Sequence, residues 1–236
     1  MLDKIVKSIP NAITLCNLLA GCVATYMTFH AGEYYGSLSG LQWVWVWIGM
    51  AAVFDFCDGA AARLLKAYSD IGRELDSLSD LVSFGVAPGM MILNTMSAQG
   101  EWQWLGFVAL LIPAFGAYRL AKFNVDTTQS ATFRGLPIPA NAIFWIGVSG
   151  WITANGYPGD IEMLVLVVIM SWLMVCNLRM FSLKFKNFDW RENFRRYILI
   201  LSTLMFVLIW GVAGLSWVVV LYVSISAFGR KEQPEA

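Results

Sequence analysis

Long apolar stretches separated by short polar connections run along almost the whole chain. An α-helix needs roughly 20 such residues to cross the hydrocarbon core of a bilayer. About eight spans are predicted, at residues 11–29, 41–65, 73–96, 102–122, 139–154, 161–176, 197–210 and 215–228. The last two are short and meet at residues 211–214, so we expect a tight hairpin there and a count between six and eight. Pro88 and Gly89 are expected to break or bend the third span.

Residues 2–9 mix apolar and charged side chains at roughly helical spacing. This pattern predicts a short amphipathic helix on the membrane surface, with Lys4 and Lys7 toward lipid phosphates. The spans and their connections leave no room for a soluble domain. Residues 1–236 are therefore expected to form one membrane domain.

Composition excludes an ordinary soluble protein. The 236 residues are 58% hydrophobic and only 14% charged, whereas soluble domains carry roughly 25% charged residues. The predicted fold class is therefore an all-α, polytopic integral membrane helical bundle. The cysteines lie in apolar runs without metal-ligand spacing, so they are expected to be small packing residues. They are Cys16, Cys22, Cys57 and Cys176.

Charge is distributed unevenly between the two ends of the predicted spans. All 16 Lys and Arg residues lie in or beside the N-terminus, every second connection and the C-terminus. The opposite connections and their edges carry no Lys or Arg, and contain instead His30, Glu33, Glu101, Asp160 and Glu162. Because basic residues are retained on the cytoplasmic side, both termini are predicted to be cytoplasmic.

Four aspartates stand out at the cytoplasmic ends of the second and third spans. Asp55 and Asp58 are three residues apart, and Asp76 and Asp80 are four apart, so each pair shares one face of its helix. The hairpin between the spans is short enough for the two faces to meet. Four carboxylates so close together would repel one another unless cations neutralised them. Hard oxygen ligands suit Mg²⁺ or Mn²⁺ rather than zinc.

Two residues beside the aspartates point to a phosphate ligand. Gly59 allows a substrate to approach the helix backbone, and Arg63, one turn further on, can pair with a phosphate. Two alternatives remain: a structural ion-pair network with Arg63, Lys66 and Arg73, and the site of a cation or lipid transporter, which would also place acids in spans. A buried carboxylate inside a span is costly and is usually functional, which favours a metal site.

The string D-x2-D-G-x2-A-R-x8-G-x3-D-x3-D, from Asp55 to Asp80, is similar at every position to the signature of the CDP-alcohol phosphotransferase family. Residues 10–17 resemble the family's nucleotide-contacting segment. Residues 79–88, 119–124 and 133–139 resemble the phosphatidylserine synthase branch in particular. Residues 173–179 and 182–184 match more loosely.

This resemblance implies transfer of a phosphatidyl group from CDP-diacylglycerol to L-serine, with release of CMP. It implies that Asp55, Asp58, Asp76 and Asp80 hold Mg²⁺ or Mn²⁺, with two ions, and that Asp80 is the general base for the serine hydroxyl. The residues it implies for contacts with the CDP-diacylglycerol are Asn11, Thr14, Gly59, Arg63 and Ser69.

The acceptor is decided by other residues. A serine carboxylate calls for a cationic partner, and Arg119 with Asn124 is the predicted serine site. Arg119 could equally serve as a snorkelling anchor to lipid phosphates. Another acceptor of the same family, glycerol 3-phosphate or inositol phosphate, remains open, because Lys122, Arg134 and Arg179 would suit a phosphorylated alcohol.

The expected partners are CDP-diacylglycerol, L-serine and membrane lipids, with a homodimer implied by the resemblance. Nucleic acid is not an expected partner, because the basic residues at 179–196 are explained by anionic lipid of the inner leaflet. The expected location is the bacterial inner (cytoplasmic) membrane, with the active site facing the cytoplasm.

Overall fold

The computed structural model describes residues 2–125, 134–181 and 189–228; the side chains of residues 2–7, 191 and 192 are outside the description. The orientation predicted for Lys4 and Lys7, and the matches at Phe133 and at residues 182–184, therefore lie outside the described residues. The helices are α1 (Leu2–Thr28), α2 (Gly40–Leu64), α3 (Asp70–Asp80), α4 (Ala87–Gln99), α5 (Leu111–Val125), α6 (Ile138–Asn155), α7 (Asp160–Val175), α8 (Trp190–Trp210) and α9 (Gly214–Phe228).

Shorter elements join these helices. The π-helical turn η1 (Leu81–Val86) connects α3 to α4, and the 3-10 helices η2 (Gln103–Leu110) and η3 (Gly211–Ala213) lead into α5 and α9. One small antiparallel hairpin, β1 (Tyr34–Tyr35) with β2 (Leu38–Ser39), follows α1. Gly36 takes a positive φ of 70° at its turn, a conformation that glycine adopts at little cost.

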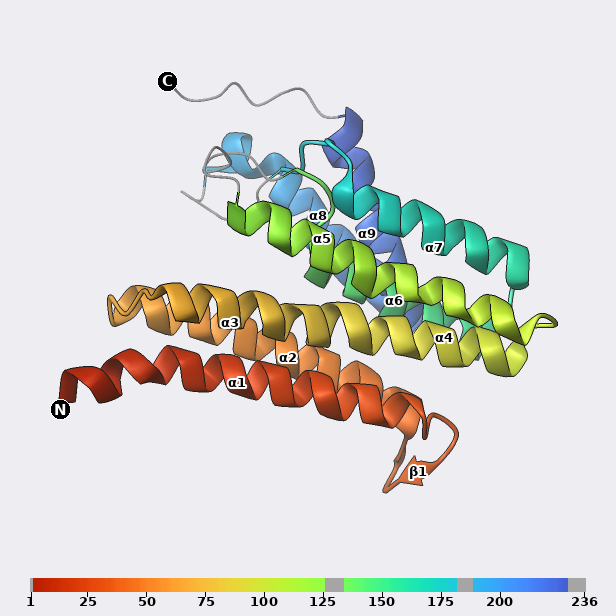
Figure 1. Cartoon of the computed structure of the whole chain (residues 1–236). Helices are drawn as coiled ribbons and strands as arrows, with labels where there is room; N and C mark the ends of the chain where they lie inside the picture. The colour runs from red at the N-terminus through yellow and green to blue at the C-terminus, as the bar shows by residue number, and fades with distance from the viewer. Residues whose placement is uncertain (1, 126–133, 182–188, 229–236) are drawn as a thin grey trace.

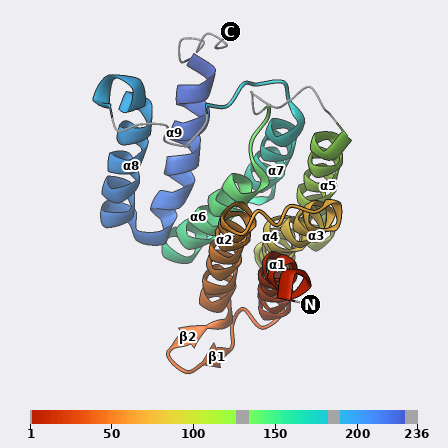
Figure 2. The same cartoon turned by 90° about the vertical axis from the view of Figure 1, so that its left-hand side faces the viewer.

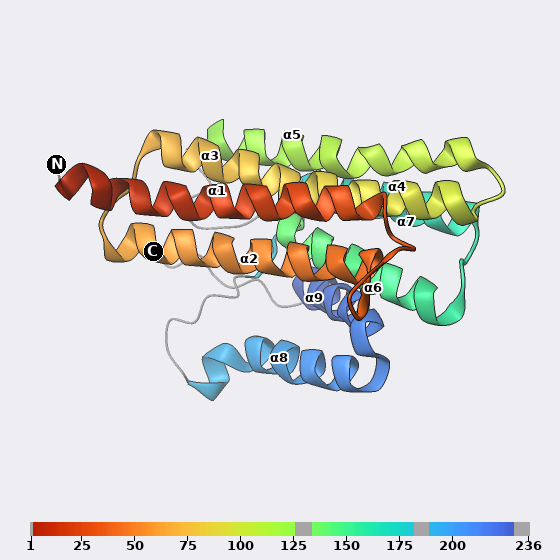
Figure 3. The same ribbon diagram turned by 90° about the horizontal axis from the view of Figure 1, so that it is seen from below.

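The rods run up and down in alternation, so that two ends of the bundle can be told apart (Figures 1 and 3). One end holds the start of α1, the α2–α3 connection and the ends of α5, α7 and α9. The other holds the β hairpin and the turns before η2, α7 and α9. Lysines and arginines described in the structure belong to segments at the first end: Arg63, Lys66, Arg73, Arg119, Lys122, Arg134, Arg179, Arg195 and Arg196.

The only histidine of the chain lies at the opposite end, as its sequence position predicts. The His30 ring is 2.9 Å from a Glu33 carboxylate oxygen, and the Tyr35 hydroxyl donates to the other oxygen, also at 2.9 Å. These hydrogen bonds, first from His30 and then from Tyr35, hold the pKa of Glu33 below its usual value. This small network is far from the aspartates.

The molecule is a multi-pass membrane protein. Five described helical stretches are long and apolar enough to cross a membrane: Ser8–Thr28, Gly40–Leu64, Asp70–Gln99, Gln103–Val125 and Asn193–Phe228. The last contains two arms, α8 and α9, which lie side by side as a hairpin turned at Gly211 (Figure 2). Adding α6 and α7, of 18 and 16 residues, gives the eight rods that the sequence predicts. The predicted all-α helical bundle is confirmed.

Two prolines, Pro10 and Pro88, lie inside continuous helices. Pro10 lies inside the continuous helix α1, so the surface segment and the first span are one helix. A break at Pro88 and Gly89, one of the two outcomes predicted for the third span, is wrong, because Asp70–Gln99 is helical throughout. The preceding turn widens to a π-helix, with the Ala87 amide donating to the Val82 carbonyl five residues back. Such a wide turn is a common local response inside membrane helices, where it satisfies backbone groups that a proline would leave free.

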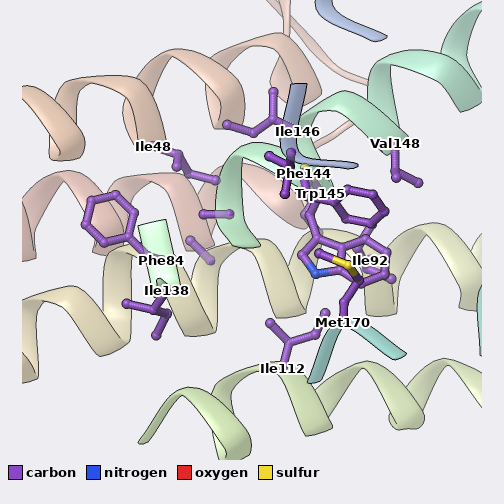
Figure 4. Close-up of a cluster of buried hydrophobic side chains, with 14 of the residues drawn as sticks. Ile48, Phe84, Ile92, Ile112, Ile138, Phe144, Trp145, Ile146, Val148 and Met170 are labelled. Carbon is purple, nitrogen blue, oxygen red and sulfur yellow. The ribbon is translucent and has the colours of Figure 1, made fainter. Parts of the chain in front are cut away.

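The core is centred on α6, whose residues are buried on nearly every side. Figure 4 shows Trp145 of α6 beside Ile92 of α4 and Met170 of α7, and Ile138 of α6 beside Phe84 of η1. On its other side α6 approaches α9 closely, since a Cβ at Gly147 would lie 2.9 Å from the Ser216 Cα. Small residues allow such backbone approach between membrane helices. α6 therefore ties the last hairpin to the rest of the bundle.

Candidate active site

Three of the four predicted aspartates converge between α2 and α3. Asp55, Asp76 and Asp80 each offer a carboxylate oxygen, and these atoms all lie within 4.8 Å of one another. The site is recessed, because Asp80 is only 9% exposed. The i, i+4 spacing of Asp76 and Asp80 on α3 turns both toward α2, as the sequence predicts.

Asp58, the fourth predicted aspartate, lies on α2 one helical turn after Asp55. It is 6% exposed, and its Oδ2 is buried without a hydrogen-bond partner among the described residues. Oδ1 of Asp76 is in the same situation. Asp58 and Asp76 also line one cavity together. The structure thus assembles all four carboxylates at the α2–α3 hairpin.

The donor set fits a divalent cation. In the part of the chain that the structure describes, no Lys or Arg forms an ion pair with any of these carboxylates. Arg73 instead pairs with Asp70 at 3.9 Å and with Glu74 at 3.5 Å, so it does not supply the structural network considered as an alternative. Buried carboxylate oxygens without partners are costly, and a hard cation would satisfy them.

Helix α1 supports the acid cluster through residues absent from the predicted site. Asn17, fully buried, donates from Nδ2 to Oδ1 of Asp80 at 3.3 Å. Ser83 donates to the Asn17 carbonyl at 2.9 Å, and Ser79 donates to the Thr14 carbonyl at 3.2 Å. A Cβ at Gly21 would lie 2.7 Å from the Ser83 Cα, so glycine lets α1 reach this position. Asn17 ends the segment that resembles the family's nucleotide-contacting region, which was its only sequence signal.

A cavity of about 550 Å³ opens beside the acids. Four of the five residues predicted to contact CDP-diacylglycerol line it: Asn11, Thr14, Gly59 and Ser69. Arg63, the fifth, is exposed, and its Nη1 lies 3.6 Å from the position of a Cβ at Gly59. Ser69 also caps α3 by accepting from the Gly72 amide at 3.0 Å. The structure therefore gathers α1, α2 and the start of α3 around one cavity.

The two residues predicted to bind serine have different surroundings. Asn124, near the end of α5, donates to Ser77 at 3.0 Å and to Glu74 at 3.2 Å. Arg119 extends into the protein, where its Nε is buried without a described hydrogen-bond partner. Its electrostatic neighbours are Asp80 and Tyr222. Arg119 is thus placed near the acids, whereas Asn124 is held against the outer part of α3.

Three basic side chains, including Arg119, line one small pocket. Lys122 and Arg134 line it with Arg119, and the end of α7 closes it through Met174 and Cys176. The pocket holds only about 20 Å³, enough for one or two small polar groups. Lys122 and Arg134 are not part of the predicted serine site, although both lie on the side expected for a cationic partner of the acceptor. Their gathering here depends on the fold, since they are 12 positions apart in sequence.

The comparisons with known proteins agree with this geometry. The CDP-alcohol phosphatidyltransferase family model matches residues 7–186. A protein named CDP-diacylglycerol–serine O-phosphatidyltransferase from Bacillus subtilis (strain 168) is 41% identical over 132 residues, which cover 56% of this chain and 69% of the relative. One of the same name from Helicobacter pylori (strain J99) is 34% identical over 221 residues, covering 90% of this chain and 86% of the relative.

A third protein of that name, from Methanocaldococcus jannaschii, is 30% identical over 173 residues, which cover 73% of each chain. The family match spans α1 through α7 and includes the acid cluster and the cavity beside it. The chain belongs to the CDP-alcohol phosphatidyltransferase family.

Proposed function

We propose that this protein transfers the phosphatidyl group of CDP-diacylglycerol to L-serine, forming phosphatidylserine and CMP. The observation that carries the proposal is the convergence of Asp55, Asp76 and Asp80 within 4.8 Å, beside a cavity lined by Asn11 and Ser69. The relatives named for this reaction support serine as the acceptor.

The four aspartates are proposed to hold Mg²⁺ or Mn²⁺, with two ions as the family resemblance implies. Such cations screen the diphosphate and stabilise charge that develops on the leaving CMP. The unpartnered oxygens of Asp58 and Asp76 support this role, because they are available as ligands. The cavity on that side of the acids is where the CDP moiety is proposed to bind, with Arg63 at its edge as a phosphate partner.

Asp80 is proposed as the general base. It takes the proton of the serine hydroxyl while the serine oxygen forms a bond to the lipid-side phosphorus and the bond from that phosphorus to CMP breaks. Asn17 donates to one oxygen of Asp80, which leaves the other oxygen to face the acceptor. Arg119 is proposed to bind the serine carboxylate, with Asn124 at the outer edge of the same site.

The location of the acids near one end of the rods suits a substrate that is half lipid. Diacylglycerol chains can stay between exposed apolar side chains such as Phe56, which is 71% exposed on α2, while CMP and serine exchange with water. The charge distribution supports a cytoplasmic active site in the bacterial inner membrane. A homodimer is proposed from the family resemblance.

A phosphorylated acceptor is a second candidate, and the gathering of Arg119, Lys122 and Arg134 around one pocket favours it. Purified protein supplied with CDP-diacylglycerol and Mn²⁺ should be offered L-serine, glycerol 3-phosphate and inositol phosphate in separate reactions. CMP release and a new lipid are expected with serine. A lipid product only with another alcohol would contradict serine as the acceptor, and no CMP release with any of them would contradict the enzyme and favour a transporter.

A further inference from the structure

The final hairpin lies outside the family match, which ends at residue 186. Its second arm, α9, nevertheless packs along α6 and lies between α6 and α8 (Figure 2). Tyr222 of α9 is only 5% exposed and belongs to the same buried cluster as Trp145. A buried tyrosine hydroxyl inside a membrane protein needs a hydrogen-bond partner. The identity of that partner shows which part of the protein the final hairpin holds in place.

The partner is the segment that follows α7. The Tyr222 hydroxyl donates to the Phe181 carbonyl at 3.1 Å. The two rings also pack edge to face, with their centroids 5.0 Å apart. Both contacts act on one residue, so α9 holds the chain at Phe181 by its backbone as well as by its side chain.

That segment is paired in turn with the chain entering α6. The Gly135 amide donates to the Leu178 carbonyl at 2.8 Å, and the Leu136 amide donates to the Leu173 carbonyl at 2.9 Å. Arg134 and Arg179 form an antiparallel bridge at the same place. Gly135 has a φ of 75°, and a Cβ there would lie 2.9 Å from the Met174 carbonyl carbon. The pairing therefore has little freedom to shift.

This pairing positions the cations of the small pocket. Arg134 belongs to the chain entering α6, Met174 and Cys176 lie at the end of α7, and Arg119 and Lys122 line the pocket from α5. Tyr222 is also an electrostatic neighbour of Arg119. A continuous path of contacts thus runs from the last helix, through Phe181, to the residues on the acceptor side of the acid cluster.

We propose that Tyr222 is a positioning residue for the acceptor alcohol: its hydroxyl holds the segment after α7 at Phe181, which sets Arg134 and Arg119 around the pocket. The inference rests on the proposed function for the identity of the acceptor. It assigns the final hairpin a role in acceptor binding and leaves the CDP-diacylglycerol cavity, built from α1, α2 and α3, independent of it.

The test is Tyr222→Phe, which keeps the ring packing and removes the hydrogen bond. The KM for serine is expected to rise roughly three- to tenfold, while the KM for CDP-diacylglycerol stays within about twofold. Tyr118→Phe is the matched control, because Tyr118 precedes Arg119 but is 62% exposed; both of its KM values should match the parent protein. Thermal unfolding in detergent should show that both variants are folded.

An unchanged serine KM in folded Tyr222→Phe would overturn the proposal, and so would an equal rise in both KM values, which would indicate general loosening. Gly135→Ala perturbs the same pairing from the other side and should also raise the acceptor KM selectively; it decides the matter if Tyr222→Phe is not folded. If the parent protein makes no lipid from serine, the proposed function fails by itself, and the same comparison is made with the alcohol that it accepts.

Discussion

Replacing Asn17 with alanine tests whether α1 takes part in catalysis or only in packing. Asn17 is fully buried and donates to Oδ1 of Asp80 at 3.3 Å across the α1–α3 interface. In the proposed mechanism this bond orients the Asp80 carboxylate toward the serine hydroxyl. Asn17→Ala removes the donor and leaves that carboxylate oxygen without this partner.

The size of the effect follows from the geometry of the bond. A hydrogen bond to a charged group contributes about 1.5–3 kcal/mol. The separation of 3.3 Å is longer than the usual N–H···O distance, so the lower part of that range applies. A loss of about 1.5–2 kcal/mol from the transition state corresponds to a fall in kcat of roughly 10- to 30-fold.

The assay is CMP release at saturating serine and CDP-diacylglycerol. Asn94→Ala is the matched control, because Asn94 of α4 also donates to a buried residue of α1, Thr28, at 3.1 Å, but toward the opposite end of the bundle. Its kcat is expected to stay within about twofold of the parent value. Equal kcat values for Asn17→Ala and the parent protein would refute the role of Asn17, and an equal loss in both variants would indicate disturbed helix packing.

Three further outcomes are expected. Asp80→Asn should abolish turnover while CDP-diacylglycerol binding remains measurable, because it removes the proposed base and keeps the shape; normal turnover would exclude that role. Arg119→Ala should raise the serine KM roughly tenfold or more, with a smaller effect on the lipid KM, because a charge-assisted contact is lost; an unchanged serine KM would contradict the assignment. Gly21→Ala should lower thermal stability by about 1–3 kcal/mol, because its Cβ would meet Ser83, whereas Gly49→Ala, with nothing within 4 Å, should not; equal unfolding midpoints would contradict the close packing.

Local sequence patterns determined the positions of most helices and the shared face of the aspartates. Length and apolarity of each run predict the eight rods to within a few residues at most ends, because a helix in lipid satisfies its own backbone hydrogen bonds and needs no partner to form. The starts of α1 and α8 are exceptions. α1 begins at Leu2, nine residues before the predicted span, because it continues the surface segment. α8 begins at Trp190, seven residues before the predicted start at Tyr197, since a polar first turn carries no hydropathy signal. The Asp55–Asp80 spacing likewise predicts a shared face, because helical geometry decides it locally.

The position of a proline in the sequence does not decide by itself where a helix ends. Pro88 predicts a break or a bend, yet the helix from Asp70 to Gln99 continues through a π-helical turn. Pro10 also lies inside a continuous helix, α1. A proline removes one hydrogen bond, and whether the helix ends there depends on packing and on alternative backbone partners, which are tertiary properties.

Only the tertiary structure decided which side chains support the four aspartates. Asn17 and Asp80 are 63 positions apart, and Tyr222 and Phe181 are 41 apart, so neither contact follows from helical or strand spacing. The cations of the acceptor pocket come from α5 and from the chain entering α6, brought together by the backbone pairing at Gly135. The sequence by itself determined the membrane-spanning helices, the distribution of basic residues between their two ends, and the spacing of the four aspartates. Contacts between rods arise from close packing, which has no sequence period, and the fold alone decided the support of Asp80 and the shape of the acceptor side.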